Sequence, residues 1–392
     1  MNGPLELPGL IDLHAHLREP GSEESETIAT GARAALRGGF TTVCAMANTE
    51  PAIDSPGLVA EVLRRGEEAR AARVLAIASI TRGRRGTELA DLVELARAGA
   101  VAFSDDGDPV QDARIFRSAL EHSLVAGRVV IEHPQDKAIS GKGVMHEGRV
   151  SAALGLAGVP AAAEESAVAR AIALARHTGA RLHLTHLSTA ASVDLVRRAK
   201  ADGARVTADV TPHHLSLTDE WVAGARHFAW ETPGPRGAAY DSATRVNPPL
   251  RTAADVEACW RGVADGTIDA IATDHAPHAS IRKDVEYDAA ANGISGLETA
   301  LSVLLMAVDA GLAPLDAVVR ALTSGPARVL GIELPRDRIL VDRTARWTVT
   351  ADALVSKGKN TPLIGREIVG KVVRATVDGQ IRYDALPASV AR

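Results

Sequence analysis

Short apolar runs alternate with longer amphipathic segments as far as about residue 330, and this alternation constrains the fold most strongly. The runs predicted as strands are residues 7–17, 41–47, 74–80, 101–104, 129–132, 181–187, 206–210 and 268–273. The segments predicted as helices, with apolar residues at helical spacing, are 27–37, 58–70, 88–97, 113–126, 164–178, 192–202 and 253–264. Several strands are almost wholly apolar, as expected for strands buried on both faces. Eight such strands with intervening helices predict an α/β fold, a (β/α)8 TIM barrel, rather than an open sheet.

The pattern changes after about residue 330, where short strands are predicted at 346–350, 371–377 and 380–383, with a turn at Asp378-Gly379. We therefore predict a barrel domain over residues 7–330 and a small β-rich, sandwich-like domain over 331–392 together with 1–6. The chain of 392 residues has room for both, since a (β/α)8 barrel takes about 250 residues.

Composition excludes several classes of function. The net charge of −5 does not suggest a nucleic-acid binder. The chain has only two cysteines, which argues against a disulfide framework and fits a reducing compartment. No apolar run reaches the roughly 18 residues that a membrane span needs, and the N-terminus lacks the pattern of a signal peptide. We expect a cytoplasmic protein.

Five of the predicted strands end in histidine or aspartate. Catalytic residues of such barrels come from the C-terminal ends of the strands, so these side chains are expected to meet at one mouth. The strand ends in question are Asp12-Leu13-His14-Ala15-His16, Ser104-Asp105-Asp106-Gly107, Ile131-Glu132-His133, Leu184-Thr185-His186 and Thr273-Asp274-His275.

These residue types predict a metal-dependent hydrolase. His14 and His16 lie two apart on a strand, so both side chains point to the same side. Imidazole nitrogen and carboxylate oxygen are the ligands expected for zinc. Four histidines and two aspartates exceed the needs of one tetrahedral ion, which suggests two ions sharing a bridging carboxylate and a bridging water. Two ions would acidify that water, and a free carboxylate could accept and return its proton. The spacing does not decide between Asp105 and Asp106.

The chain resembles the dihydroorotases of the amidohydrolase superfamily, in the bacterial class with an aspartate at the fourth strand. The resemblance runs from Pro8 to about Tyr383. The matching stretches are PGLIDLHAHLREPG, GGFTTVCAMANTEPAID, AFSDDGDPV, LHLTHLST, VTPHHL, RVNPPLR, IATDHAPH, GISGLETAL and SKGKNTPLIG.

The resemblance implies a role for each matching position. The implied metal ligands are His14, His16, Asp106, His133, His186 and Asp274, with Asp106 as the bridge. Asp274 would also be the general acid and base. The implied substrate contacts are Arg18, Asn48 and His278 for a carboxylate and Asn247 for a pyrimidine ring. Arginine presents a planar fork suited to a carboxylate, and asparagine can both donate and accept, as a cyclic imide requires.

The implied reaction is the reversible cyclisation of N-carbamoyl-L-aspartate to L-dihydroorotate plus water, a step of pyrimidine synthesis. A metal-bridged hydroxide, with about two Zn²⁺ per chain, would attack the ring carbonyl. The chain begins almost at the first barrel strand, so the second domain is expected to be reduced relative to the family. An uncovered tail edge would favour homo-oligomers, and assembly with aspartate carbamoyltransferase is a further expectation.

Two alternatives remain at this point. A hydantoinase or allantoinase would place a carboxylated lysine at the end of strand four, but residues 100–107 contain no lysine. An inactive homologue serving as a scaffold for a transcarbamoylase would be expected to have lost ligands, whereas all six candidates are present. Outside the site, His213-His214 is interpreted as structural, residues 82–85 as a solvated loop, and Cys44 as a core residue.

Overall fold

The computed structural model describes residues 4–386, and eight parallel strands form its centre. In sheet order they are β11 (Ala270–Ile271), β10 (Val206–Val210), β9 (Leu182–Leu184), β6 (Val129–Glu132), β5 (Ala102–Phe103), β4 (Arg73–Ala78), β3 (Phe40–Ala45) and β2 (Leu10–Ala15). The two end strands also meet, because Ala15 pairs with His275 and the His16 amide donates to the His275 carbonyl at 2.8 Å. This closure confirms the predicted barrel.

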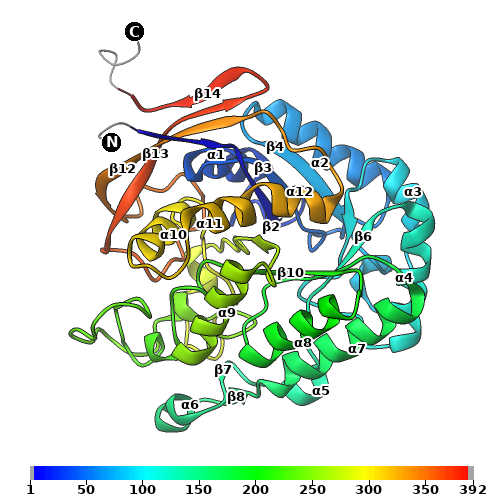
Figure 1. Cartoon of the computed structure of the whole chain (residues 1–392), viewed down its shortest axis with the longest axis horizontal. Helices are drawn as coiled ribbons and strands as arrows, with labels where there is room; N and C mark the ends of the chain where they lie inside the picture. The colour runs from blue at the N-terminus through cyan, green and yellow to red at the C-terminus, as the bar shows by residue number, and fades with distance from the viewer. Residues whose placement is uncertain (1–3, 387–392) are drawn as a thin grey trace.

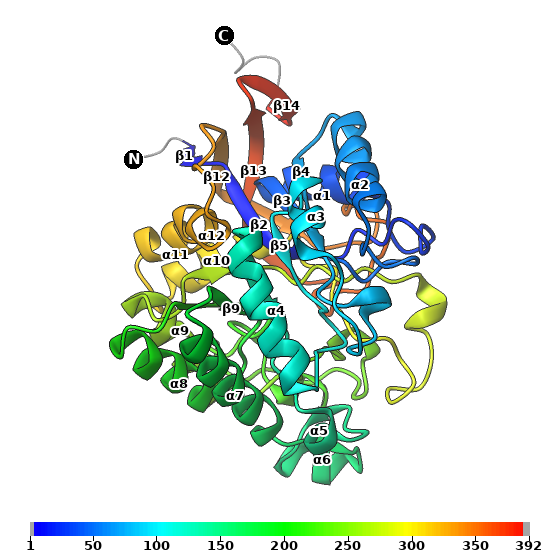
Figure 2. The ribbon, with the colours of Figure 1, turned by 90° about the vertical axis from the view of Figure 1, so that its right-hand side faces the viewer.

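Helices surround the barrel (Figures 1 and 2). Those predicted from the sequence are observed as α1 (Ile28–Gly38), α2 (Pro56–Ala69), α3 (Leu92–Arg97), α4 (Ala113–Ala126), α7 (Ala162–Thr178), α8 (Ala190–Ala201) and α9 (Ala253–Asp265). The local sequence explains their ends. Thr27 caps α1 by accepting a hydrogen bond from the Thr30 amide, and Gly39 ends the helix with a φ of 92°.

Three more helices, α10 (Ala300–Asp309), α11 (Leu315–Leu322) and α12 (Ser324–Leu330), follow the last barrel strand, where no helix was predicted. Helix α10 is apolar on most of its faces, since it packs between the barrel and the second sheet. A helix without a polar face lacks the periodicity on which the prediction rests.

The tail forms a four-stranded antiparallel sheet in the order β1 (Leu5–Pro8), β12 (Arg338–Thr348), β13 (Glu367–Val377) and β14 (Gln380–Asp384). The predicted hairpin turn is present, with Asp378 and Gly379 at φ values of 51° and 74°. Strand β12 begins at Arg338, eight residues before the predicted position 346. Its first part was not predicted because two register shifts interrupt the alternation of its side chains.

The prediction of one strand over residues 7–17 was wrong, because the chain leaves one sheet and enters the other at Gly9. The Gly9 amide donates to the Asp337 carbonyl at 2.9 Å, and β1 and β2 lie on either side. A Cβ atom at Gly9 would lie 2.2 Å from the Thr41 hydroxyl oxygen, so the close approach of the two sheets requires glycine here.

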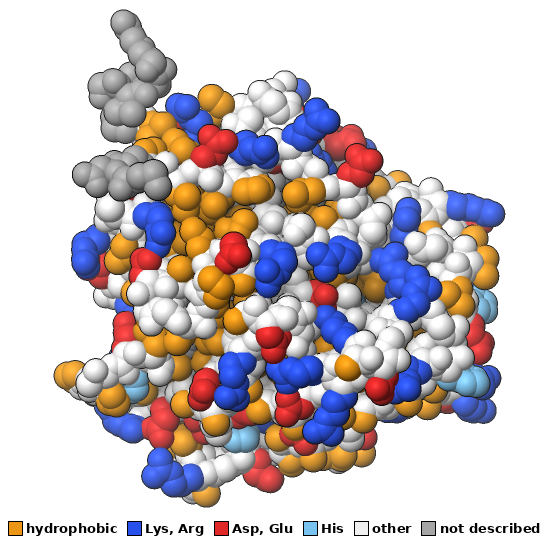
Figure 3. Space-filling view, viewed as in Figure 1, with side chains coloured by type: hydrophobic (Ala, Val, Ile, Leu, Met, Phe, Trp, Pro, Cys, Tyr) orange, Lys and Arg blue, Asp and Glu red, His pale blue; other side chains and the backbone are white. Residues whose placement is uncertain are grey.

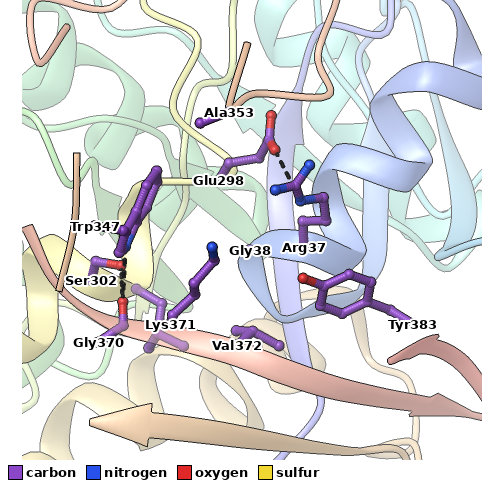
Figure 4. A pocket seen from close by; sticks show the side chains of 11 residues that line it. Arg37, Gly38, Glu298, Ser302, Trp347, Ala353, Gly370, Lys371, Val372 and Tyr383 are labelled. Carbon is purple, nitrogen blue, oxygen red and sulfur yellow. Dashed lines mark hydrogen bonds and ion pairs between the residues drawn. The ribbon is translucent and has the colours of Figure 1, made fainter. Parts of the chain in front are cut away.

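A small cavity lies where α1 and α10 meet β13 (Figure 4). Arg37 and Glu298 line it with an ion pair at 3.6 Å, and Lys371 and Trp347 enter it from the antiparallel sheet. The antiparallel sheet therefore packs on the barrel through a partly polar interface.

The long connection after β6 is folded. It contains α5 (Lys137–Ser140), α6 (Arg149–Leu154) and the short parallel pair β7 (Met145–His146) and β8 (Gly158–Val159). This segment and the antiparallel sheet lie at opposite ends of the molecule (Figures 1 and 2).

Basic and acidic side chains are interspersed on the face that carries α8 and α9 (Figure 3). Arg197 of α8, for example, pairs with Asp265 of α9 at 3.1 Å. Both cysteines are free and buried, as expected for Cys44. Within residues 4–386, no helix is both long and apolar enough to cross a membrane.

Candidate metal centre

The six predicted metal ligands lie together at the C-terminal end of the barrel. They come from five strands and are all buried, with no residue more than 7% exposed. The set is His14 in β2, His16 just after it, Asp106 after β5, His133 after β6, His186 after β9 and Asp274 after β11.

Asp106 faces two pairs of histidines with its two carboxylate oxygens. Its Oδ2 atom lies 3.2 Å from Nε2 of His14 and 3.5 Å from Nε2 of His16. Its Oδ1 atom lies 3.2 Å from Nδ1 of His133 and 3.4 Å from Nε2 of His186. One carboxylate thus stands between two sets of candidate ligands, which is the arrangement that a bridging ligand needs.

Asp274 completes one of these sets. Its Oδ1 atom lies 3.0 Å from Nε2 of His16 and 3.4 Å from Nε2 of His14. Ligand atoms of His14, His16 and Asp274 lie within 4.8 Å of one another, and so do those of His14, Asp106 and His186. Both groups are compact enough to surround an ion.

The electrostatics of the site favour a cation. Burial opposes a charge on His14, yet Asp106 and Asp274 raise its pKa to about 10. Burial alone would raise the pKa of Asp106, but the nearby histidines lower it well below its ordinary value. The Nε2 atom of His14 is buried and has no hydrogen-bond partner. A divalent ion would satisfy both this nitrogen and the negative charge, so the residues fit a metal.

The far sides of the His16 and His133 rings face amide side chains. Nδ1 of His16 lies 2.8 Å from Oδ1 of Asn48, and Nε2 of His133 lies 3.2 Å from Oε1 of Gln135. An amide oxygen only accepts, so Nδ1 of His16 carries the hydrogen and its Nε2 presents a lone pair to the site.

Asp105 is directed away from the ligands. It accepts hydrogen bonds from the amides of Ile80 at 2.8 Å and Thr81 at 3.1 Å, and also from the Thr81 hydroxyl. Burial raises its pKa to about 6. Asp105 therefore anchors the chain after β4, and Asp106 is the aspartate that faces the histidines.

A pocket of about 160 Å³ opens beside the metal ligands. The four predicted substrate contacts, Arg18, Asn48, Asn247 and His278, all line it. Nη2 of Arg18 lies 3.3 Å from Nε2 of His278, and the Arg18 Nε atom donates to the Pro277 carbonyl at 3.1 Å. The pocket therefore combines a positive guanidinium with neutral amide groups.

Three of these residues adopt a left-handed backbone. The φ angles are 59° for Arg18, 40° for His186 and 46° for Asp274. This region is unfavourable for residues other than glycine and persists only where the surroundings enforce it. The fold thus stores backbone strain in the segments that carry the candidate ligands and the arginine.

Sequence reasoning missed Gln135, which connects two parts of the site. Its Oε1 atom accepts from Nδ2 of Asn247 at 3.0 Å while it also faces His133. Its position two residues after His133 gives no signal of this role. Gly293, with a φ of 141°, brings its backbone against Ala276 at the pocket wall.

Two other motifs can now be placed. His214 contacts the Thr211 hydroxyl at 2.8 Å and the Pro248 carbonyl at 3.1 Å, in accord with its structural interpretation. The solvated-loop prediction for residues 82–85 was wrong for Arg84. Its guanidinium is partly buried and donates to the Asp106 carbonyl and to Asp108, because the loop folds over the strand end that carries Asp106.

Comparisons with known proteins agree with this picture. A family model described as dihydro-orotase-like matches residues 3–192. A dihydroorotase of Anaeromyxobacter dehalogenans (strain 2CP-C) is 49% identical over 384 residues, which cover 96% of this chain and 86% of the relative. A dihydroorotase of Pelotomaculum thermopropionicum is 50% identical over 389 residues, covering 97% and 87%.

Solved structures show a similar fold. The L-hydantoinase of Arthrobacter aurescens superposes with a TM-score of 0.83 at 22% identity, covering 98% of this chain and 86% of the other. A D-hydantoinase gives a TM-score of 0.78 at 22% identity, covering 97% and 86%. At this level of identity the likeness concerns the fold alone.

Proposed function

The chain belongs to the dihydroorotase family, and from this premise we propose that it catalyses the reversible cyclisation of N-carbamoyl-L-aspartate to L-dihydroorotate and water. One observation supports the proposal above others. The carboxylate of Asp106 faces two histidine pairs beside a pocket whose lining includes Arg18, Asn48 and Asn247.

The proposed metal is zinc, at about two ions per chain. His14, His16 and Asp274 would hold one ion, His133 and His186 the other, and Asp106 both. When bound, two such ions lower the pKa of water and polarise a carbonyl oxygen.

Arg18, Asn48 and His278 would hold the carboxylate that substrate and product share. The guanidinium supplies charge and a planar set of donors, which suits a carboxylate. Burial and the charge of Arg18 lower the pKa of His278 to about 3, so its ring is neutral and contributes hydrogen bonds rather than charge. Asn247, fixed by Gln135, would pair with the amide edge of the ring.

Asp274 would move the proton. In the hydrolytic direction, the water oxygen bonds to the ring carbonyl carbon, and Asp274 accepts a proton from this water. The bond between that carbon and the ring nitrogen then breaks, and Asp274 returns the proton to the nitrogen. The carboxylate ends unchanged, as a general acid and base must.

The purified chain should be offered N-carbamoyl-L-aspartate at mildly acidic pH while dihydroorotate is followed by its absorbance. We expect steady formation of dihydroorotate, and hydrolysis of dihydroorotate when the reaction is run from the other side. Hydantoin and allantoin serve as matched cyclic amides without the carboxylate. Hydrolysis of either one, with no turnover of dihydroorotate, would overturn the proposal.

Cytoplasmic location, homo-oligomers and assembly with aspartate carbamoyltransferase stay predictions.

A further inference from the structure

We propose that Asp209 and Thr185 are positioning residues, which fix two candidate metal ligands at once and thereby raise the affinity of the site for zinc. The proposal rests on the proposed function only in taking His14 and His186 as metal ligands. Neither Asp209 nor Thr185 lines the pocket beside the ligands, so any effect on metal must act through the ligands.

Asp209 lies at the end of β10 and is completely buried. Its Oδ1 atom accepts from the His186 amide at 2.6 Å. Its Oδ2 atom accepts from the Thr185 hydroxyl at 3.0 Å and lies 2.8 Å from Nε2 of His183. The Asp209 carboxylate thus contacts three residues of one short segment, namely His183 in β9 and Thr185 and His186 just after it.

The contact with Thr185 settles which nitrogen of His14 faces the metal position. Nδ1 of His14 lies 2.9 Å from the Thr185 hydroxyl oxygen. A hydroxyl has one proton, and Thr185 gives it to Asp209, so toward His14 the oxygen can only accept. In its neutral form, which is the form that binds a metal, His14 therefore carries its hydrogen on Nδ1. The lone pair is left on Nε2, the atom that faces Asp106 and Asp274.

The contact of Asp209 with the His186 amide stabilises a strained backbone conformation at His186. His186 has a φ of 40°, which is unfavourable for a residue with a side chain. The short hydrogen bond from its amide to Asp209 fixes this conformation and directs its ring toward Asp106. Asp209 therefore acts on His14 through Thr185 and on His186 through the backbone.

The chain offers a matched pair of substitutions. Thr185→Val replaces the hydroxyl between Asp209 and His14 by a methyl group of similar size. Thr207→Val makes the same change at the far end of the network, where the Thr207 hydroxyl lies 2.9 Å from Nδ1 of His183 and contacts no candidate ligand. Thr185→Ser keeps the hydroxyl. Asp209→Asn replaces the carboxylate, which accepts from the Thr185 hydroxyl and the His186 amide, by a neutral amide.

Zinc affinity should be measured without substrate, by competition with a chromogenic chelator, and folding should be checked by circular dichroism. We expect Thr185→Val and Asp209→Asn to weaken zinc binding about 10- to 100-fold, the usual effect of losing a group that orients a ligand. Thr185→Ser and Thr207→Val should stay within about 3-fold of the unaltered chain, well short of that effect.

Wild-type zinc affinity in Thr185→Val, or an equal loss of zinc affinity in Thr207→Val, would overturn the proposal. A failure of the unaltered chain to bind zinc would overturn it as well. Because the readout is metal binding, a chain that binds zinc and responds as expected, but does not form dihydroorotate, would refute the proposed function and leave this inference intact.

Discussion

The Nδ1 atom of His16 lies 2.8 Å from the Oδ1 atom of Asn48. Asn48 also lines the pocket that we assign to the substrate. One amide therefore orients a candidate metal ligand with its oxygen and leaves its nitrogen for the substrate. The metal centre and the carboxylate site are linked through this side chain, so they are not independent.

This link predicts different outcomes for two substitutions of Asn48. Asn48→Asp keeps an acceptor for His16 but replaces the donor by a negative charge. We expect it to retain zinc and to raise the KM for N-carbamoyl-L-aspartate. Asn48→Ala loses both groups, so zinc affinity should fall about 10-fold or more as well. Metal competition and steady-state kinetics on both variants test this, and equal zinc loss in the two would contradict it.

Arg18→Lys tests the carboxylate contact. Lysine keeps the charge but loses the planar fork, so we expect KM to rise on the order of 10-fold with a smaller change in kcat. Arg282→Lys is a suitable control, since Arg282 is exposed and is not among the residues that line the pocket. An unchanged KM in Arg18→Lys, measured by initial rates in both directions, would exclude this arginine from carboxylate binding.

Asp274→Asn tests the proton transfer. The amide cannot accept and return a proton, so kcat should fall by about 10²- to 10⁴-fold. Circular dichroism should show an unchanged fold. The exposed Asp284→Asn serves as a control with the same change in charge. Turnover near the wild-type rate in Asp274→Asn would refute its role as acid and base.

His214 predicts a pH dependence of stability. Burial lowers its pKa from 6.5 to about 3, so below pH 6.5 the unfolded chain binds a proton at this ring that the folded chain does not. Stability should therefore fall as the pH decreases from 6.5 toward 3, by up to about 1.4 kcal/mol per pH unit for this one group.

His214→Gln should remove the uptake of about one proton on unfolding and so lower that slope by up to about 1.4 kcal/mol per pH unit. Urea unfolding at several values between pH 4.5 and 7 measures the slope in both proteins. Parallel stability curves for His214→Gln and the unaltered chain would show that this histidine does not contribute.

Sequence reasoning predicted the barrel because strands buried on both faces and amphipathic helices have distinct patterns. It also predicted that His14, His16 and the other strand-end residues lie together, because the C-terminal ends of parallel barrel strands meet at one rim. It could not separate Asp105 from Asp106, since adjacent carboxylates differ only in the partners that the fold gives them. Contacts such as that of Gln135 with Asn247 join loops far apart in the chain, and no local pattern records them.

Helix α10 was missed for a related reason. Helix α10 is buried between the barrel and β13, and a helix covered on most faces carries no amphipathic signal. The boundary at Gly9 was missed because the residues on both sides of it read as one extended run. Only the pairing of β1 with β12 separates them.

We propose that Asp106 and the residues around it hold the metal on which turnover depends. The direct test is to remove metal from the purified chain with a chelator, and then to add Zn²⁺ stepwise while dihydroorotate formation is measured. We expect no turnover without metal and a rise in turnover that saturates at about two ions per chain, as a shared bridging carboxylate implies. Full turnover by the metal-free chain would contradict it.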